Sequence, residues 1–348
     1  MEKYGYRFSF GPWNIHEGAD PFGPPVRPTR TFDDKLAVYK ILGFDAVQFH
    51  DDDAVPQLDE LSPAQIRETA RAMRRKLSDN GLVAEFVAPR LWEHPMTIDG
   101  AYTANDPKVR AYAIDRSRKA VDIAKEIGTD LMVLWLAREG TYLRESKDVV
   151  RASHQILEAV NNLLDYDSTL RIVIEPKPNE PIDMAYIPTI GHALALGMQT
   201  KDPTRVGVLL ESAHAILAGL DPADEIGYAL AFGKLWSVHL NDQNGLKYDQ
   251  DRSFGAVNLR SAFNQVRVLD ENRFWEIGTV GLDIKALRTQ PAELAVKHLR
   301  NSLHMFSRLV GLVRSLDMPL INSLIAARDY EELDWLVLNH LLPELKLE

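Results

Sequence analysis

The sequence contains no cysteine, so disulfide bonds and thiolate chemistry are both excluded. It also lacks any apolar run long enough to cross a bilayer. Its first residues, Met1–Tyr4, lack the basic and then apolar layout of a signal peptide. No internal repeat, linker or low-complexity tract divides the chain. We therefore expect a single cytoplasmic protein that has no membrane partner.

The chain also has fewer basic than acidic residues. The chain has 40 Lys and Arg against 50 Asp and Glu, a formal net charge of −10. Because an acidic surface repels phosphate backbones, we expect no nucleic-acid partner. The 348 residues are 45% hydrophobic and 26% charged, which is typical of a globular protein.

Short β-branched runs alternate with longer amphipathic segments, a pattern typical of βα units and a parallel sheet. Eight runs are predicted as strands: Tyr6–Phe10, Phe44–Phe49, Leu82–Val87, Leu131–Leu136, Arg171–Glu175, Val206–Glu211, Leu235–Leu240 and Arg273–Ile277. The intervening helices are predicted near 33–42, 62–80, 107–128, 147–166, 185–199, 223–232 and 258–269. Eight such units predict one α/β domain, a (β/α)8 TIM barrel over residues 1–300. Residues 301–348 are expected to form a C-terminal helical tail that serves oligomerisation.

Side chains that can take part in catalysis or ligand binding recur just after the predicted strands. In this fold the active site lies at the carboxyl ends of the strands. The side chains found there are Trp13, His50 with Asp53, Arg90, Trp135, Glu175 with Lys177, Glu211 with His214, His239 and Glu276. Their recurrence at strand after strand predicts an active site at this rim of the barrel.

Four of these residues suit a divalent cation. Glu175, Glu211, His239 and Glu276 end predicted strands five to eight. Because neighbouring strands lie about 5 Å apart, these side chains can converge on one ion. Three carboxylates and an imidazole suit Mg²⁺, Mn²⁺ or Co²⁺. The alternative is that each carboxylate pairs with a nearby Lys or Arg; the set as a whole favours a metal.

A second group of candidate ligands follows strands six and seven. His214 lies three residues after Glu211, and Asp249 and Asp251 stand two apart in a loop. Glu211 could bridge two ions, leaving the other three side chains to hold the second. An Asp-x-Asp pair alone is weak evidence, because turns are rich in aspartate.

Lys177 lies between two prolines that fix its backbone, which suits a cation aimed at a carbonyl oxygen. The alternative is a solvated loop charge. His50 with Asp53 is a candidate general base or proton shuttle. Equally, the aspartates that follow His50 could cap the next helix.

Three tryptophans stand at or just past predicted strand ends. Trp13 and Trp135 are predicted to wall a sugar pocket, because aromatic faces exclude water and stack on sugars. Trp92 fits either the site or ordinary packing.

Several motifs resemble the xylose isomerase family, in its shorter class. They are Asp20–Gly23, Phe49–Asp53, Arg138–Gly140, Ile174–Pro181, Gly191–Ala195 and Gln243–Asp251, and they follow the family's order over residues 5–300. The segments Ile174–Pro181 and Gln243–Asp251 are the most specific. The chain is therefore identified as a member of this superfamily.

The resemblance implies one or two divalent ions (Mn²⁺, Mg²⁺ or Co²⁺) per subunit and a small-molecule sugar substrate. It implies that an aldose and a ketose are interconverted by a hydride shift between C2 and C1. His50 with Asp53 would assist ring opening and Lys177 would polarise the carbonyl. Glu211 would bridge the ions. The remaining implied roles are Glu175 at the first ion, His214, Asp249 and Asp251 at the second, Trp13 and Trp135 as walls, and Phe22 reaching into a neighbouring subunit's site.

Two departures from the family pattern affect the expected chemistry. His239 stands where the family has an aspartate ligand, and Glu276 is assigned to the place of another. Replacing a carboxylate by imidazole removes a negative charge and favours Mn²⁺, Co²⁺ or Zn²⁺. The altered set resembles related sugar epimerases, so an epimerase or a C–C or C–O lyase acting on an oxidised sugar or sugar conjugate is the alternative. A sugar-binding relative without turnover is a third hypothesis.

The tail after residue 300 is shorter than the family's. We expect a homo-oligomer, a dimer or a tetramer, and a separate partner subunit stays open.

Overall fold

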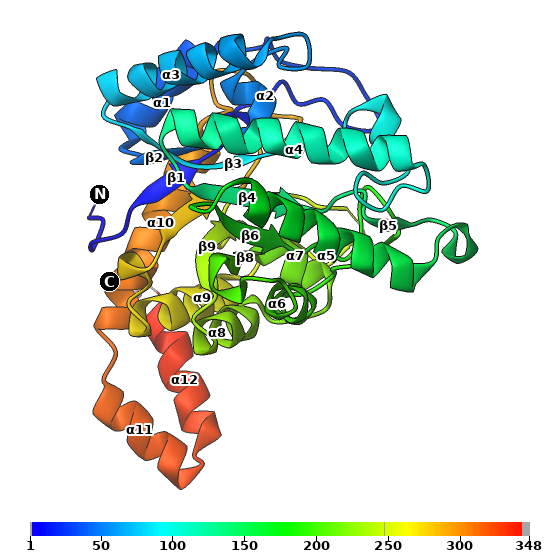
Figure 1. Cartoon of the computed structure of the whole chain (residues 1–348). Helices are drawn as coiled ribbons and strands as arrows, with labels where there is room; N and C mark the ends of the chain where they lie inside the picture. The colour runs from blue at the N-terminus through cyan, green and yellow to red at the C-terminus, as the bar shows by residue number, and fades with distance from the viewer. Residues whose placement is uncertain (1, 247, 343–348) are drawn as a thin grey trace.

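Eight parallel strands close into a barrel in the order β1-β10-β9-β8-β6-β4-β3-β2 (Figure 1). The computed structural model describes residues 2–246 and 248–342. The barrel strands are β1 (Phe8–Phe10), β2 (Ala46–His50), β3 (Val83–Ala88), β4 (Leu131–Trp135), β6 (Arg171–Glu175), β8 (Val206–Glu211), β9 (Leu235–Leu240) and β10 (Thr279–Leu282). The predicted (β/α)8 fold is confirmed.

Helices surround the barrel, as expected where crossovers join parallel strands. They are α1 (Phe32–Leu42), α2 (Asp51–Ala54), α3 (Pro63–Asp79), α4 (Pro107–Ile127), α5 (Val149–Tyr166), α6 (Ile190–Met198), α7 (Ser212–Leu217), α8 (Pro222–Ala231), α9 (Leu259–Glu271) and α10 (Lys297–Arg314). Short 3-10 turns lie at Pro12–Asn14, Pro95–Thr97, Arg144–Ser146, Pro203–Arg205 and Phe274–Glu276. A small antiparallel pair, β5 (Gly140–Thr141) with β7 (Met184–Ala185), stands outside the barrel.

Local sequence signals set the helix ends. Ser62 caps α3 by accepting a hydrogen bond from the Gln65 amide, with Pro63 in the first turn. Gly43 ends α1 in the left-handed region at φ 79°, which costs a glycine little. Once its ends are set, each helix buries its apolar stripe against the strands; α5, for example, buries Ile156, Val160 and Leu163.

The last strand lies further along the chain than we predicted. Residues Phe274–Glu276, placed in a strand from the sequence, form a 3-10 turn, and β10 begins at Thr279. Phe274 is fully buried by packing rather than by strand pairing. The true strand is hidden because it contains Gly281, which weakens a strand signal. A Cβ there would lie 2.8 Å from the Val238 carbonyl oxygen and 2.9 Å from the His239 ring.

The interior of the barrel contains one polar layer below the rim. Ser237 Oγ donates to Glu85 Oε1 over 2.7 Å, and Gln48 Nε2 donates to Oε2 over 3.2 Å. The Ser9 hydroxyl donates to the same carboxyl group. Burial raises the pKa of Glu85, although these hydrogen bonds oppose the shift.

The C-terminal part leaves the barrel. α10 packs Leu303, Phe306 and Val310 into the core, and residue 300 lies within this helix. Beyond it, α11 (Met318–Ala327) and α12 (Tyr330–Leu341) form a projecting helical pair (Figure 1). This confirms a helical C-terminal extension.

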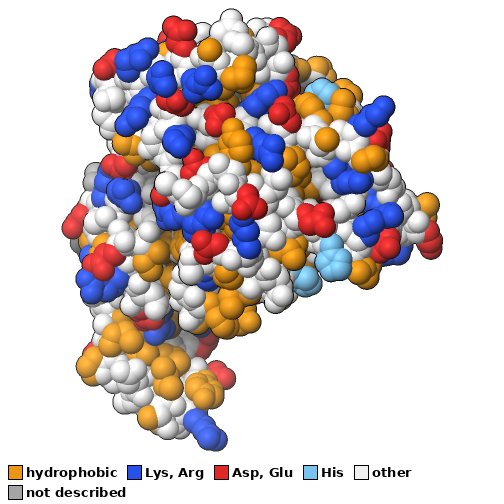
Figure 2. All heavy atoms as spheres, in the orientation of Figure 1, with side chains coloured by type: hydrophobic (Ala, Val, Ile, Leu, Met, Phe, Trp, Pro, Cys, Tyr) orange, Lys and Arg blue, Asp and Glu red, His pale blue; other side chains and the backbone are white. Residues whose placement is uncertain are grey.

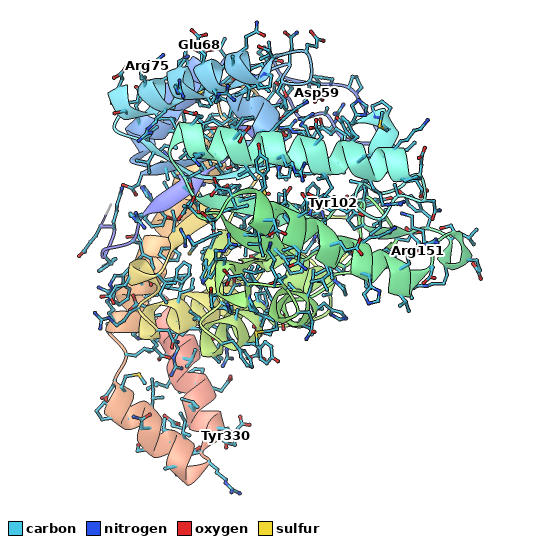
Figure 3. All side chains as sticks on the ribbon, viewed as in Figure 1. Asp59, Glu68, Arg75, Tyr102, Arg151 and Tyr330 are labelled. Atoms are coloured by element: carbon cyan, nitrogen blue, oxygen red, sulfur yellow. The ribbon has the colours of Figure 1, made fainter. Side chains whose placement is uncertain are left out.

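The projecting pair carries exposed apolar side chains. Figure 3 shows Tyr330 on α12, far from the barrel. Hydrophobic side chains gather on this part of the surface in Figure 2, and the large exposed ones here include Leu320, Ile325, Tyr330 and Trp335. Among the described residues no single helix is long and apolar enough to cross a membrane; α10 and α11 pass that test only as a pair bent by 72°.

Candidate metal centre and active site

Three adjacent strands deliver the first candidate ligands to the carboxyl rim of the barrel. Glu175, Glu211 and His239 lie at or near the ends of β6, β8 and β9, and Glu211 pairs with His239 in the sheet register. Asp283 follows directly after β10. Four adjacent parallel strands of the eight therefore place these four side chains side by side on one half of the rim.

The first group of ligand atoms converges around His239. One oxygen each of Glu211 and Asp283 and one nitrogen of His239 lie within 4.8 Å of one another. His239 Nδ1 is 3.4 Å from Glu175 Oε1 and 3.6 Å from Glu211 Oε2. We therefore assign Glu175, Glu211, His239 and Asp283 to a first candidate metal position.

A second group shares Glu211. One set of ligand atoms comes from Glu175, Glu211 and His214, and another from Glu211, Asp249 and Asp251. His214 Nε2 lies 3.2 Å from both Glu211 Oε1 and Asp249 Oδ2. The sequence prediction that these residues lie together is matched by the structure, with Glu211 common to every group.

Glu276 is not part of the site, and its predicted metal role is wrong. It precedes β10, at the opposite end of the barrel from the rim. Its side chain is 50% exposed and pairs with Arg273. The error follows from the misplaced strand, because the residue after the true strand is Asp283. The sequence signal was available as Thr279-Val280-Gly281-Leu282-Asp283, a short apolar run that ends in a carboxylate.

Buried polar atoms without partners indicate that the site is built for a bound group. Within the described part of the chain, both ring nitrogens of His239, Nδ1 of His214 and Oδ1 of Asp249 are buried and make no hydrogen bond. Leaving such atoms unpaired costs about 1–3 kcal/mol each. Nitrogen and carboxylate donors in this arrangement fit a divalent cation, which would satisfy them together.

The acidic groups of the site strongly perturb one another. Burial raises the pKa of Glu211 to about 8; the Asp283 and Asp249 carboxylates add to this and His214 opposes it. Burial also acts to raise the pKa of Glu175, but the charge of the nearby His239 imidazole lowers it to about 2. Crowded carboxyl groups that cannot all ionise favourably are typical of a metal or catalytic site.

Asn241 makes hydrogen bonds to the candidate metal ligands, and the sequence did not predict this role. Its Nδ2 donates to Glu211 Oε1 over 2.8 Å, to the Asp283 carbonyl oxygen over 2.9 Å and to Asp251 Oδ1 over 3.3 Å. Its Oδ1 accepts from the Ala213 amide over 2.7 Å. Such outer contacts orient metal ligands.

Lys177 is buried, which removes the solvated-loop alternative. Its Nζ lies 3.0 Å from Asp249 Oδ2 and 3.1 Å from Glu180 Oε2, and 5.2 Å from the centre of the Trp135 ring. Burial acts to lower the pKa of Lys177, but the two carboxylates outweigh it and raise the pKa. A second lysine, Lys285, pairs with Asp251 and was not predicted.

His50 lies at the start of α2, and Asp53 caps this helix by accepting from the His50 backbone amide over 3.4 Å. The proton-handling role of His50 with Asp53 stays a prediction. Asp51 is fully buried and is bound by Arg116, a structural contact. Asp53 Oδ2 lies 3.0 Å from His50 Nδ1. Burial acts to raise the pKa of Asp53, but contacts with His50 and Arg90 lower it.

An aromatic wall closes the other side of the cavity. The Trp13 ring stacks on His50 at 4.2 Å, Trp92 meets His50 edge-on at 5.0 Å, and Trp92 meets Trp135 at 4.5 Å. Trp92, left open by the sequence, therefore belongs to the wall. The cavity holds about 270 Å³ and is lined by these rings, both ligand groups, Lys177, Lys285 and Arg90.

Phe22 does not line this cavity. Its side chain is 79% exposed, and its ring centre lies 6.0 Å from that of Tyr248, in the loop that carries Asp249. Its predicted role in a neighbouring subunit's site stays a prediction.

A family model described as xylose isomerase-like TIM barrel matches residues 36–300, well over half of the chain. The protein belongs to this family. Both the motifs that resemble xylose isomerase and the closed eight-stranded barrel agree with this membership.

Solved structures share the fold of this xylose isomerase-like barrel. A D-tagatose 3-epimerase-like protein has a TM-score of 0.63 at 15% identity, covering 88% of this chain and 98% of that one. The IOLI protein, solved with a zinc atom, has a TM-score of 0.60 at 15% identity, covering 89% and 100%. A D-psicose 3-epimerase from Clostridium cellulolyticum H10, solved with D-tagatose, has a TM-score of 0.54 at 14% identity, covering 88% and 96%.

Proposed function

We propose that this xylose isomerase-like barrel is a divalent-metal-dependent sugar isomerase that interconverts an aldose and a ketose. The observation that carries the proposal is the position of Glu211, which belongs to every group of candidate ligands and lines the same cavity as Lys177. Two ligand groups and a buried lysine fit a substrate with neighbouring oxygens at its reacting carbons.

The first group, Glu175, Glu211, His239 and Asp283, would hold one ion, and Glu211, His214, Asp249 and Asp251 a second. When bound, such ions act as Lewis acids on the sugar oxygens, an effect worth several kcal/mol. Carboxylate ligands suit Mn²⁺, Mg²⁺ or Co²⁺, and the imidazole of His239 moves the preference toward Mn²⁺, Co²⁺ or Zn²⁺. The zinc atom in the structure of the IOLI protein supports a divalent ion in this fold.

The chain's own residues position the substrate. Lys177 offers an ammonium hydrogen-bond donor at the cavity wall, suited to a carbonyl oxygen. The tryptophans present apolar faces to the sugar carbons and exclude water. A dry pocket of this kind favours direct movement of hydride between C1 and C2 over proton exchange with solvent.

The direct test is incubation of the full chain with Mn²⁺ and a panel of aldoses in D2O. The proposal expects ketose formation with little deuterium in the product. Lys177→Met should lower the turnover rate by about 10²-fold or more, a loss typical of removing one such donor. Lys76→Met, which changes an exposed helix lysine paired with Asp33, is the matched control and should have no effect. Absence of turnover across the panel with bound Mn²⁺ would count against the proposal.

An epimerase is the second candidate, favoured by His239 and by the 3-epimerases among the solved structures of the fold. Epimerisation next to a carbonyl removes a carbon-bound hydrogen as a proton. Incorporation of solvent deuterium at C3 of a ketose, without aldose formation, would favour the epimerase over the isomerase.

We also propose a homo-oligomer that uses the α11–α12 pair. Although α12 packs Val337 and Leu341 against the core, this projecting pair leaves Tyr330 and Trp335 more than half exposed, and paired copies would cover them. Light scattering of the full chain tests this: a dimer or tetramer is expected, and a Trp335→Ser chain should dissociate more readily. A monomer at all concentrations would overturn it.

A further inference from the structure

Two charged side chains, Asp53 and Arg90, meet at one nitrogen of the His50 ring. Its Nδ1 atom lies 3.0 Å from Asp53 Oδ2 and 2.5 Å from Arg90 Nη2. Arg90 Nη2 also lies 3.1 Å from Asp53 Oδ2, which closes a triangle. Arg90 follows β3 at the rim of the barrel, and the sequence indicates no role for it.

Both ends of this triangle are held in place. The Arg90 backbone amide donates to Asp51 Oδ1 over 3.1 Å, and Arg90 Nε lies 3.1 Å from Asp52 Oδ1. The His50 ring is held between Trp13 and Trp92. Neither the guanidinium nor the imidazole is free to turn away from the other.

The chemistry of arginine bears on which nitrogen of His50 carries the proton. A guanidinium has only donors and stays protonated in proteins. Nδ1 therefore meets two opposite demands, because Arg90 at 2.5 Å needs an acceptor and the Asp53 carboxylate at 3.0 Å needs a donor. The shorter contact, to Arg90, favours an Nδ1 that accepts and carries no proton. Asp53 keeps its partners in this arrangement, because Oδ2 accepts from Arg90 Nη2 and faces the His50 backbone amide at 3.4 Å.

We propose that Arg90 is a positioning residue that holds His50 in the tautomer with its proton on Nε2, so that His50 donates a hydrogen bond into the cavity. Nε2 has no hydrogen-bond partner within the described part of the chain, and His50 lines the cavity. The ring then presents a donor, not a lone pair, to the ligand. This replaces the general-base interpretation: with Asp53 alone as partner, Nδ1 would hold the proton and Nε2 would accept.

The ligand atom that this donor fits is an oxygen with a free lone pair, such as a sugar ring oxygen. This naming of the oxygen rests on the proposed function. The tautomer itself does not, because it follows from contacts within the protein.

The test is ¹⁵N NMR of the histidine rings in the full chain, because chemical shifts distinguish protonated from unprotonated ring nitrogens. A His50→Asn chain identifies the signals. At a pH where these signals no longer change, the proposal expects Nε2 protonated and Nδ1 bare. A wild-type ring with its proton on Nδ1 would overturn the proposal without any variant.

Arg90→Met removes the donor and keeps an apolar stem. The proton should then move to Nδ1, facing Asp53, and an unchanged tautomer in this variant would also overturn the proposal. If Arg90→Met does not fold, the double change with Asp52→Asn removes one carboxylate together with the guanidinium. Arg71→Met, on the exposed face of α3, is the control and should leave the His50 signals unchanged.

Kinetics give a second readout. With a substrate found, Arg90→Met should lower kcat by about 10²-fold, the lower end for loss of a positioned proton-handling group, and leave Mn²⁺ affinity within about threefold. If no sugar is turned over, the proposed function fails, yet the NMR result still decides the tautomer.

Discussion

The indole Nε1 of Trp13 donates a hydrogen bond of 2.9 Å to Oδ1 of Asp283. Trp13 comes from the loop after β1, and Asp283 follows β10, the neighbouring strand in the closed barrel. The same ring stacks on His50. One side chain therefore walls the cavity and orients a candidate metal ligand.

Trp13→Phe tests this double role, because phenylalanine keeps an aromatic face but has no N–H. We expect Mn²⁺ affinity to fall by about 10–100-fold, as is usual when an outer contact of a ligand is lost. Calorimetric titration measures the change. Trp92→Phe, which removes an indole in the same wall that contacts no candidate ligand, should bind Mn²⁺ normally; equal losses in both variants would refute the account.

Glu211→Gln should abolish both metal positions. Its burial and raised pKa of about 8 mean that the metal-free protein already holds this group neutral, so the amide should be tolerated in the fold. Mn²⁺ affinity should fall by more than the roughly 100-fold expected for an outer contact. Glu276→Gln is the matched control at the other end of the barrel. A Glu211→Gln chain that binds two ions as tightly as wild type would contradict the site.

Metal binding should strengthen as pH rises. Because burial raises the pKa of Glu211 to about 8, the folded metal-free protein keeps a proton there at lower pH, and an ion must displace it. Stability of the metal-free fold due to this group is present below the ordinary glutamate pKa and is lost as pH rises toward 8. Apparent Mn²⁺ affinity should climb between about pH 6 and 8, by up to about tenfold per unit for one proton, and then level off. A flat profile would exclude proton displacement at Glu211.

Glu85→Gln should stabilise the protein at neutral pH. Burial raises the pKa of Glu85, so the folded state favours its neutral form and loses stability as pH rises through the raised value. The amide stays neutral and can still accept from Ser237. Denaturant unfolding at several pH values should show the variant's advantage growing with pH. A variant less stable than wild type at every pH would show that the charged form is favoured in the fold.

The fold could be predicted closely because its signals are local. Seven strands overlap their predicted positions, since uninterrupted β-branched runs such as Val206–Glu211 point to buried parallel strands. The eighth could not, because Gly281 interrupts it and the aromatic run at Phe274 gives a stronger false signal. The glycine is needed for close approach to β9, which is a tertiary reason invisible in a single sequence.

The candidate site could likewise be predicted only in part. Glu175, Glu211 and His239 could be predicted as neighbours, because strand ends meet at one rim. Asp283 was missed together with its strand. The contact of Arg90 with His50 joins β2 to the loop after β3, and no spacing in the chain reports which loops touch above a barrel.

Anomalous diffraction at the manganese edge, from crystals grown with excess Mn²⁺, tests the central claim most directly. We expect one peak among Glu175, Glu211, His239 and Asp283, and a second among Glu211, His214, Asp249 and Asp251. A rim without such peaks, where the carboxylates contact only Lys177, Lys285 and water, would contradict it.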